Sequence, residues 1–200
     1  MPLRSRVVER SLHVFSEHGY EATSVAMLCD AAGISVGSLY HHFANKAGVA
    51  AAVYADVLES YQQTLINVTE SVTSAEAGVR GLVGAHHEWV ARNTHGARFL
   101  MTSGNVAEIS GSAERWRPAN DALVDELARW AEPHMEAGEL RRLDPAVFAA
   151  VIFGPSYMHS TATLSRRMSP GDDTVDTVLA FAEAAWRALR ADESGTSAGE

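Results

Sequence analysis

Apolar side chains recur every three or four residues along nearly the whole chain, which is the spacing that places them on one face of an α-helix. No segment shows the alternation of apolar and polar residues, bounded by turn residues, that a half-buried strand requires. The pattern therefore predicts an all-α protein of about nine helices. Because 46% of the 200 residues are hydrophobic and 20% are charged, the chain can bury a sizeable core, in one domain or two.

Glycine and helix-capping residues divide the first part of the chain into three short helices. Gly19 and Gly33 stand where a helix would end with a left-handed residue, and Thr23 or Ser24 can cap the helix between them. The expected helices run from Arg4 to His18, from Thr23 or Ser24 to about Ala32, and from Ser35 to Phe43. The second and third are joined by a short turn, which is the arrangement of a DNA-binding helix-turn-helix.

Longer helices are expected in the rest of the chain. Asn45 can cap a fourth helix that runs through Leu65 and joins the first part of the chain to the remainder. Asp144 directly before Pro145 is typical of a helix start. The further helices are expected at about Ala75–Asn93, Ala97–Thr102, Ala113–Met135, Pro145–Arg166 and Thr174–Ala191.

The distribution of charge allows the helix-turn-helix to bind DNA. A net charge of −9 opposes such binding, because most DNA affinity comes from cations that replace counterions on phosphates. However, the first 50 residues carry four basic and four acidic side chains, so all of the excess negative charge lies after them. The same segment holds four of the nine histidines and Lys46, which is the only lysine. A neutral, histidine-rich first part can meet DNA if the acidic remainder faces away.

The segment from His18 to Lys46 resembles the DNA-binding signature of the TetR family of transcriptional regulators, in residue types and in spacing. The matching positions are Gly19, Tyr20, Thr23, Val25, Ala32, Gly33, Ser35, Gly37, Leu39, Tyr40, His42, Phe43 and Lys46. The resemblance implies a DNA-binding domain at residues 1–48 and a larger helical domain for effector binding and dimerisation at 49–191, with residues 192–200 expected to be a disordered tail. It also implies a ligand-responsive regulator, expected to be a repressor, that binds a palindromic operator as a dimer and is released by a small molecule.

The third helix is short, so only its N-terminal residues can reach base edges in the major groove. The candidates for base contacts are Ser35, Val36, Gly37, Ser38 and His41, with His41 the strongest among them. The resemblance assigns Tyr40, His42 and Lys46 to phosphate contacts. The N-terminus of the helix after Thr23, including Ser24, is a further anion site by its geometry.

Aromatic and polar side chains on the inner faces of the later helices are candidates for the effector pocket. His86 and Trp89 share one face of the fifth expected helix. Trp116, Asn120, Trp130 and His134 share a face of a later helix. Pro155 should kink the helix that contains it, which makes Tyr157 and Met158 plausible pocket residues.

The expected partners are double-stranded operator DNA, a small-molecule effector and a second copy of the chain. The resemblance implies that the last two helices form the homodimer interface. No membrane association is expected, because no run of about 18 uncharged apolar residues is present, and the location is expected to be cytoplasmic. Neither a cofactor nor a catalytic residue is expected.

Two alternatives follow from other features of the sequence. His86, His87, His134 and His159 could converge on a metal ion, which would make the chain a metal-responsive regulator with the same fold. The residues from Gly33 to Gly37 spell G-x-S-x-G, so Ser35 could be the nucleophile of a serine hydrolase if a strand preceded it.

Overall fold

The computed structural model describes residues 2–102, 113–165 and 174–192, and these ranges contain nine α-helices and no strand. The helices are α1 (Leu3–Ala22), α2 (Val25–Ala32), α3 (Val36–His42), α4 (Lys46–Ser71), α5 (Ala75–Arg92), α6 (Thr94–Thr102), α8 (Ala113–Glu136), α9 (Pro145–Leu164) and α10 (Val175–Leu189). The prediction of an all-α protein is confirmed. None of the helices in the described ranges has the length and apolarity needed to cross a membrane. The predicted tail falls outside these ranges, apart from Asp192.

Local hydrogen bonds fix where the helices begin. The side chains of Ser24, Ser35, Asn45, Ser74, Asp144 and Thr174 each accept a hydrogen bond from a backbone N–H in the first turn of the helix that follows. Gly33 ends α2 in the left-handed conformation, with a φ of 63°. Gly19 also has a positive φ, 78°, but the chain then resumes a helical turn up to Ala22, so the expected end of the first helix at His18 is only a break within α1.

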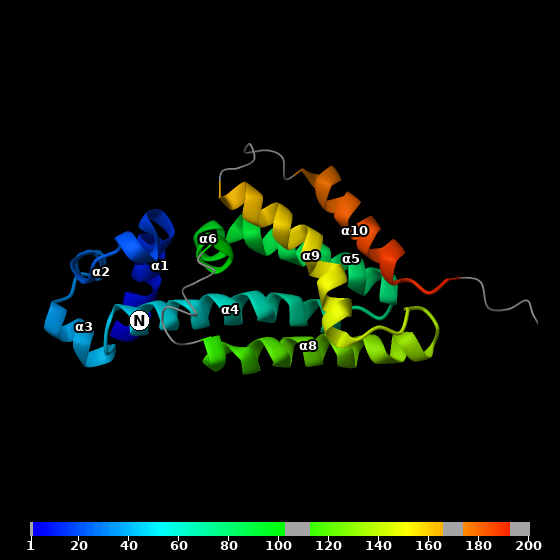
Figure 1. The fold of residues 1–200 in the computed structure, drawn as a ribbon, viewed down its shortest axis with the longest axis horizontal. Coiled ribbons are helices and arrows are strands. Elements are labelled where there is room, and N and C mark those ends of the chain that lie inside the picture. The colour runs from blue at the N-terminus through cyan, green and yellow to red at the C-terminus, as the bar shows by residue number, and fades with distance from the viewer. Residues whose placement is uncertain (1, 103–112, 166–173, 193–200) are drawn as a thin grey trace, which may run out of the picture.

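The molecule is elongated, with α1, α2 and α3 at one end as a head and the remaining helices as a body (Figure 1). Helix α4 runs lengthwise out of the head and along the body, where α8 lies beside it. Helices α5, α6, α9 and α10 cover its other side. Helix α9 bends part-way along its length in Figure 1, as expected of a helix with Pro155 in its interior.

Two clusters of buried hydrophobic side chains hold the fold together, and the first crosses the expected domain boundary. It combines head residues such as Phe15 and Leu39 with Val53 of α4 and Phe99 of α6. The second joins the later part of α4 to α5, α8, α9 and α10. The division after residue 48 remains a prediction, but the head shares its core with the body.

Candidate DNA-binding and effector sites

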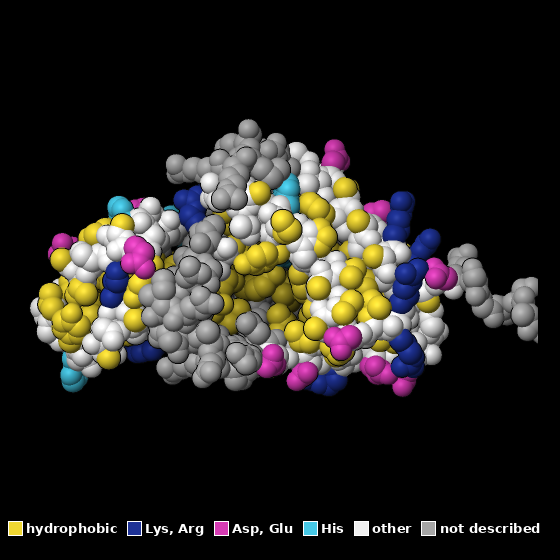
Figure 2. All heavy atoms as spheres, viewed as in Figure 1, with side chains coloured by type: hydrophobic (Ala, Val, Ile, Leu, Met, Phe, Trp, Pro, Cys, Tyr) yellow, Lys and Arg dark blue, Asp and Glu magenta, His cyan; other side chains and the backbone are white. Residues whose placement is uncertain are grey.

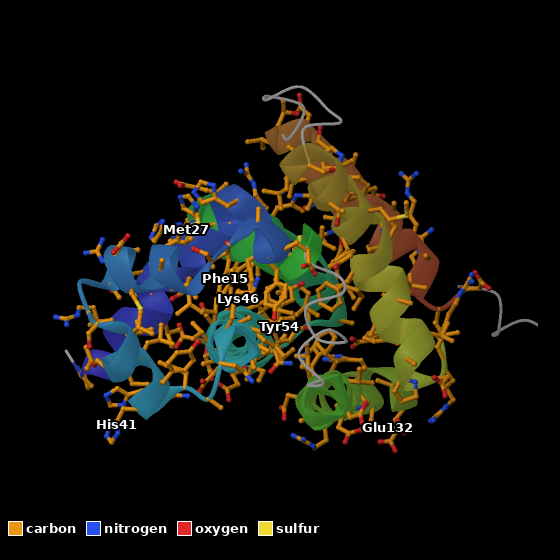
Figure 3. The ribbon with its side chains drawn as sticks, turned by 60° about the vertical axis from the view of Figure 1, so that its left-hand side comes forward. Phe15, Met27, His41, Lys46, Tyr54 and Glu132 are labelled. Carbon is orange, nitrogen blue, oxygen red and sulfur yellow. The ribbon has the colours of Figure 1, made fainter. Side chains whose placement is uncertain are left out.

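The N-terminal residues of helix α3 are exposed to solvent, while its opposite face packs against the core of the head. Leu39 is fully buried and belongs to the core of the head. Val36 and Tyr40 are about half exposed, at 47% and 49%. The other exposed residues of this segment are Ser35, Gly37, His41 and His42, and Ser38 is half-buried. Figure 3 shows His41 at the outer edge of the head, away from the body. The sequence-derived candidates for base contact thus lie together on one protruding surface.

Ser35 has a structural role at the start of this helix. Its Oγ accepts a hydrogen bond from the Ser38 backbone N–H at 3.1 Å. The segment before Gly33 is helix α2 and not a strand. A nucleophile elbow needs a strand before the serine, so the serine hydrolase alternative is wrong.

Thr23, which the sequence analysis placed at the candidate anion site before α2, has a buried side chain. Thr23 is only 2% exposed, and its hydroxyl donates a hydrogen bond to the Gly19 carbonyl oxygen at 2.7 Å. The side chain therefore fixes the turn between α1 and α2. Ser24 is exposed and caps α2, because its Oγ accepts a hydrogen bond from the Met27 N–H at 3.2 Å.

Lys46 has an internal role that the sequence analysis missed. Its Nζ donates hydrogen bonds to the carbonyl oxygens of Tyr20 and Thr23, at 2.8 and 2.9 Å, and lies 4.3 Å from the centre of the Tyr20 ring. A cation at the N-terminus of a helix interacts unfavourably with the helix dipole. The only lysine of the chain stands at the start of the expected fourth helix, and this unfavourable position was the sequence signal that it has internal hydrogen-bond partners. The ammonium group fastens the start of α4 to the turn between α1 and α2.

A hydrogen-bonded network crosses the body at the level of His86. This residue is fully buried, and its Nδ1 lies 2.8 Å from the Tyr61 hydroxyl while its Nε2 lies 3.1 Å from the Ser160 Oγ. The network therefore links α4, α5 and α9. The neighbouring Trp89 is also buried, and its Nε1 donates to the Ser60 Oγ at 3.2 Å.

Two further tyrosines lie near this network. Burial, and secondarily the neighbouring Tyr157, raises the pKa of Tyr54 and Tyr61. Tyr157 is 42% exposed, and the Phe153 ring lies 6.4 Å from the His86 ring. We call Tyr54, Tyr61, His86, Phe153, Tyr157 and Ser160 the tyrosine–histidine cluster. In the same part of the body, between α4 and α9, Figure 2 shows a hollow lined by hydrophobic side chains, and Figure 3 places Tyr54 on the side of α4 that faces α8 and α9. Tyr54 and Tyr61 are seven residues apart on one face of α4, which is the signal that could have identified them.

The other expected pocket residues do not join this cluster. Trp130 and His134 pack against each other near the end of α8, where Trp130 touches Gly78 and His134 pairs with Glu139 at 2.9 Å. Gly78 lies about 12 Å from His86 along α5, so these residues occupy a different part of the body. Trp116 and Asn120 belong to α8, but their side chains lie outside the described residues.

The expectation that Met158 faces the interior is wrong, because its side chain is 75% exposed. Other apolar residues of α9 and α10, Val147, Val175 and Leu179, are exposed as well.

The four histidines considered as metal ligands, His86, His87, His134 and His159, do not form a metal site in the described residues. His87 and His159 have ring centres 6.1 Å apart and both contact Phe181. His134 is paired with Glu139 near the end of α8. Within the described ranges, no three His, Cys, Asp or Glu residues are arranged to hold a metal ion.

Comparison with known proteins identifies the head. The family model described as "Bacterial regulatory proteins, tetR family" matches residues 7–53, which cover α1 to α3 and the start of α4. The head is therefore a DNA-binding domain of the TetR type. Among curated relatives, the HTH-type transcriptional regulator UidR of Escherichia coli strain K12 is 29% identical over 90 residues, which are 44% of this chain and 44% of UidR. The HTH-type transcriptional repressor KstR2 of Mycobacterium tuberculosis is 32% identical over 129 residues, which are 64% of this chain and 63% of KstR2.

Solved structures show the same fold over nearly the whole length of this chain. A TetR family transcription regulator from Marinobacter aquaeolei VT8 superposes with a TM-score of 0.77 at 17% identity, covering 95% of this chain and 96% of that one. The structure of the ketosteroid transcriptional regulator KstR2 of Mycobacterium tuberculosis gives a TM-score of 0.71 at 19% identity, covering 94% and 95%. At these identities the similarity establishes the fold, including the head followed by a helical body.

Because His86 is buried, we predict that the protein becomes less stable in mild acid. Desolvation, reinforced by His87, lowers the pKa of His86 from 6.5 to about 4, although a hydrogen bond with the Ser156 backbone partly opposes the shift. As the pH falls below 6.5 the unfolded chain binds a proton at this ring, whereas the folded protein binds it only near pH 4. The free energy of unfolding should therefore fall by about 3 kcal/mol across this interval from His86 alone, with no further loss from this group below it.

Urea unfolding of the wild type and of His86→Asn, from neutral pH to about pH 4, checks this expectation. The variant should be less stable at neutral pH because Tyr61 and Ser160 lose a partner, but its stability should depend less on pH. Parallel pH profiles for the two proteins would contradict the assignment to His86.

Proposed function

We propose that this chain is a cytoplasmic, ligand-responsive transcriptional repressor, which binds a palindromic operator as a homodimer and is released by a small-molecule effector. The observation that carries the proposal is the protruding surface of α3, on which the leading residues and His41 are exposed while Leu39 anchors the helix. Two relatives, DhaR of Mycobacterium sp. strain GP1 and KstR2, are named transcriptional repressors, which supports the direction of regulation.

The proposed DNA contacts divide by chemistry. Base contacts come from the exposed part of α3, with Val36 able to meet a thymine methyl group and His41 able to hydrogen-bond a base edge. Phosphate contacts come from Tyr40, His42 and the N-terminal turn of α2 after Ser24. Lys46 already donates to two carbonyl oxygens, so one ammonium hydrogen remains for a phosphate.

The proposed dimer interface is the outer surface of α9 and α10. Exposed apolar residues lie on both helices, and they are Val147, Met158, Val175 and Leu179. A groove of about 350 Å³ between the helices is lined by Val151, Ile152, Pro155, Phe181 and several alanines. An apolar surface of this kind, paired with itself about a two-fold axis, would place two α3 helices on one DNA duplex.

The proposed effector site is the hollow beside the tyrosine–histidine cluster, with Trp89 as a further wall. A ligand can change operator affinity only if it prefers one arrangement of the heads. Helix α4 connects the two regions, and α6 supplies a second contact, since His95 Nδ1 lies 3.1 Å from Ser16 Oγ and the rings of Phe15 and Phe99 are 5.6 Å apart. Displacement of α4 or α6 by a ligand would therefore be transmitted to α1.

Footprinting on the DNA upstream of the chain's own coding sequence tests the proposal. The expected result is protection of a palindromic site, together with an affinity that decreases steeply as salt increases. His41→Ala should reduce discrimination between the site and its single-base variants by about 1–3 kcal/mol at one position of each half-site. His18→Ala is the matched control, because His18 is an exposed histidine of the same head outside α3. Binding without salt dependence, or equal effects of the two substitutions, would count against this interface.

A further inference from the structure

We propose that the effector is an uncharged, mainly apolar molecule that presents a hydroxyl or carbonyl group to the Tyr61–His86–Ser160 network. This inference rests on the proposed function, because it assigns a chemical class to the effector site in the body.

The wall of the site combines aromatic surface with neutral hydrogen-bonding groups. The Tyr61 ring lies 4.9 Å from the Trp89 ring and 5.8 Å from the His86 ring, and the Phe153 ring lies 6.4 Å from the His86 ring. These rings come from α4, α5 and α9, and Figure 2 shows the apolar hollow in the part of the body where α4 and α9 lie. Such a surface favours a ligand whose main body is apolar.

The polar groups of the cluster remain neutral. Burial raises the pKa of Tyr54, Tyr61 and Tyr157 above that of an ordinary phenol. Burial and the neighbouring His87 lower the pKa of His86 to about 4, so its imidazole is neutral near pH 7. Each of these groups can therefore bind a ligand only as a neutral donor or acceptor.

Among the described residues, no buried side chain carries a charge that could pair with a charged ligand. The buried residues of the described ranges include no Asp, Glu, Lys or Arg. The half-buried Arg98 of α6 already has an interaction of its own. A carboxylate or ammonium group entering the body would lose its hydration without gaining an ionic partner, which strongly opposes binding.

The hydroxyl groups of the cluster can form hydrogen bonds with a ligand that carries an alcohol or a ketone group. Neutral imidazole has one donor and one acceptor nitrogen, and both are occupied by Tyr61 and Ser160. The two hydroxyl oxygens keep lone pairs that can accept from a ligand hydroxyl, and the exposed phenol of Tyr157 can donate to a ligand carbonyl. Both imidazole nitrogens therefore have hydrogen-bond partners without a ligand, and the hydroxyl groups can still form further hydrogen bonds with a neutral ligand.

Matched probe pairs test this inference on the full-length wild-type protein. Calorimetric titration near neutral pH would compare decan-1-ol with decanoate, and 2-naphthol with 2-naphthoate. In each pair the apolar part of the molecule, nonyl or naphthyl, is the same, and a neutral hydroxyl-bearing group replaces the carboxylate. We expect the neutral member of at least one pair to bind at least about tenfold more tightly than its anion. Equal or tighter binding of the anions, or no binding by any of the four probes, would overturn the inference.

A pair of serine variants locates the binding. Ser160→Ala should weaken binding of the neutral probe by about fivefold, because it removes one hydroxyl of the network. Ser165→Ala is the control, since this exposed serine lies just after the same helix and donates only to α9 carbonyl oxygens. Equal affinities of the two variants would place the probe elsewhere and contradict the site. If Ser160→Ala does not fold, Tyr61→Phe takes its place with the same expected loss.

Operator binding without any probe separates this inference from the proposed function. Binding to upstream DNA together with a preference for anions would reject only the effector class. Neutral-probe selectivity without DNA binding would reject the repressor function and leave the chemistry of the site intact.

Discussion

Gly78→Ala is expected to destabilise the protein by about 3 kcal/mol, which corresponds to a decrease of roughly 10 °C in the melting temperature. Gly78 is buried inside α5, and a Cβ atom built there would lie 2.0 Å from one ring carbon of Trp130 and 2.5 Å from another. The indole packs between this glycine and Phe148, so either Trp130 or helix α8 must move. Thermal and urea unfolding followed by circular dichroism measure the effect.

Gly84→Ala provides the matched control on the same helix. A Cβ atom at Gly84 would meet nothing within 4 Å, so only the intrinsic helix preference should act, and the variant should gain up to about 1 kcal/mol. Combining Gly78→Ala with Trp130→Leu should recover part of the loss, because the smaller side chain leaves room for the methyl group. Similar stabilities for the two alanine variants would show that α5 and α8 do not pack as described.

Lys46→Met is expected to abolish binding to every DNA sequence and to lower the stability of the DNA-free protein by about 2 kcal/mol. Methionine keeps an apolar chain of similar length but cannot donate to the carbonyl oxygens of Tyr20 and Thr23. The turn between α1 and α2 then loses its connection to α4, and the orientation of α3 is no longer fixed.

The stability measurement distinguishes this role from a phosphate contact. If Lys46 acted only on DNA, the melting temperature of Lys46→Met without DNA would equal that of the wild type. Arg6→Met is a useful comparison, because it removes an exposed cation from the same head without removing a described hydrogen bond to the turn. This variant should lose some DNA affinity through charge alone and keep its stability.

Helix ends and exposed faces that depend on residues close together in the chain could be predicted from the sequence. The starts at Asn45 and Asp144 and the break at Gly33 depend on hydrogen bonds and dihedral angles within one helical turn. The exposed face of α3 follows in the same way from the spacing around Leu39.

Hydrogen-bond partners and burial that depend on residues far apart in the chain could not be predicted from the sequence. His86 could be identified as an inward-facing polar residue, but its partners lie 25 and 74 positions away in the sequence. The burial of Thr23 and the exposure of Met158 depend on how whole helices turn against one another, which one-face periodicity does not determine. Periodicity therefore identified His86 and Trp89 as inward-facing, but it did not show that Trp130 and His134 lie in a different part of the body from them.

The continuous apolar cluster around Phe15, Val53 and Phe99 means that the head is not a detachable module. A fragment that ends after α3 would lack Val53 and Phe99, which belong to the same buried cluster as Phe15. Unfolding of the head and loss of the packing of α6 should accordingly occur in one cooperative transition, because the two regions share the same buried cluster.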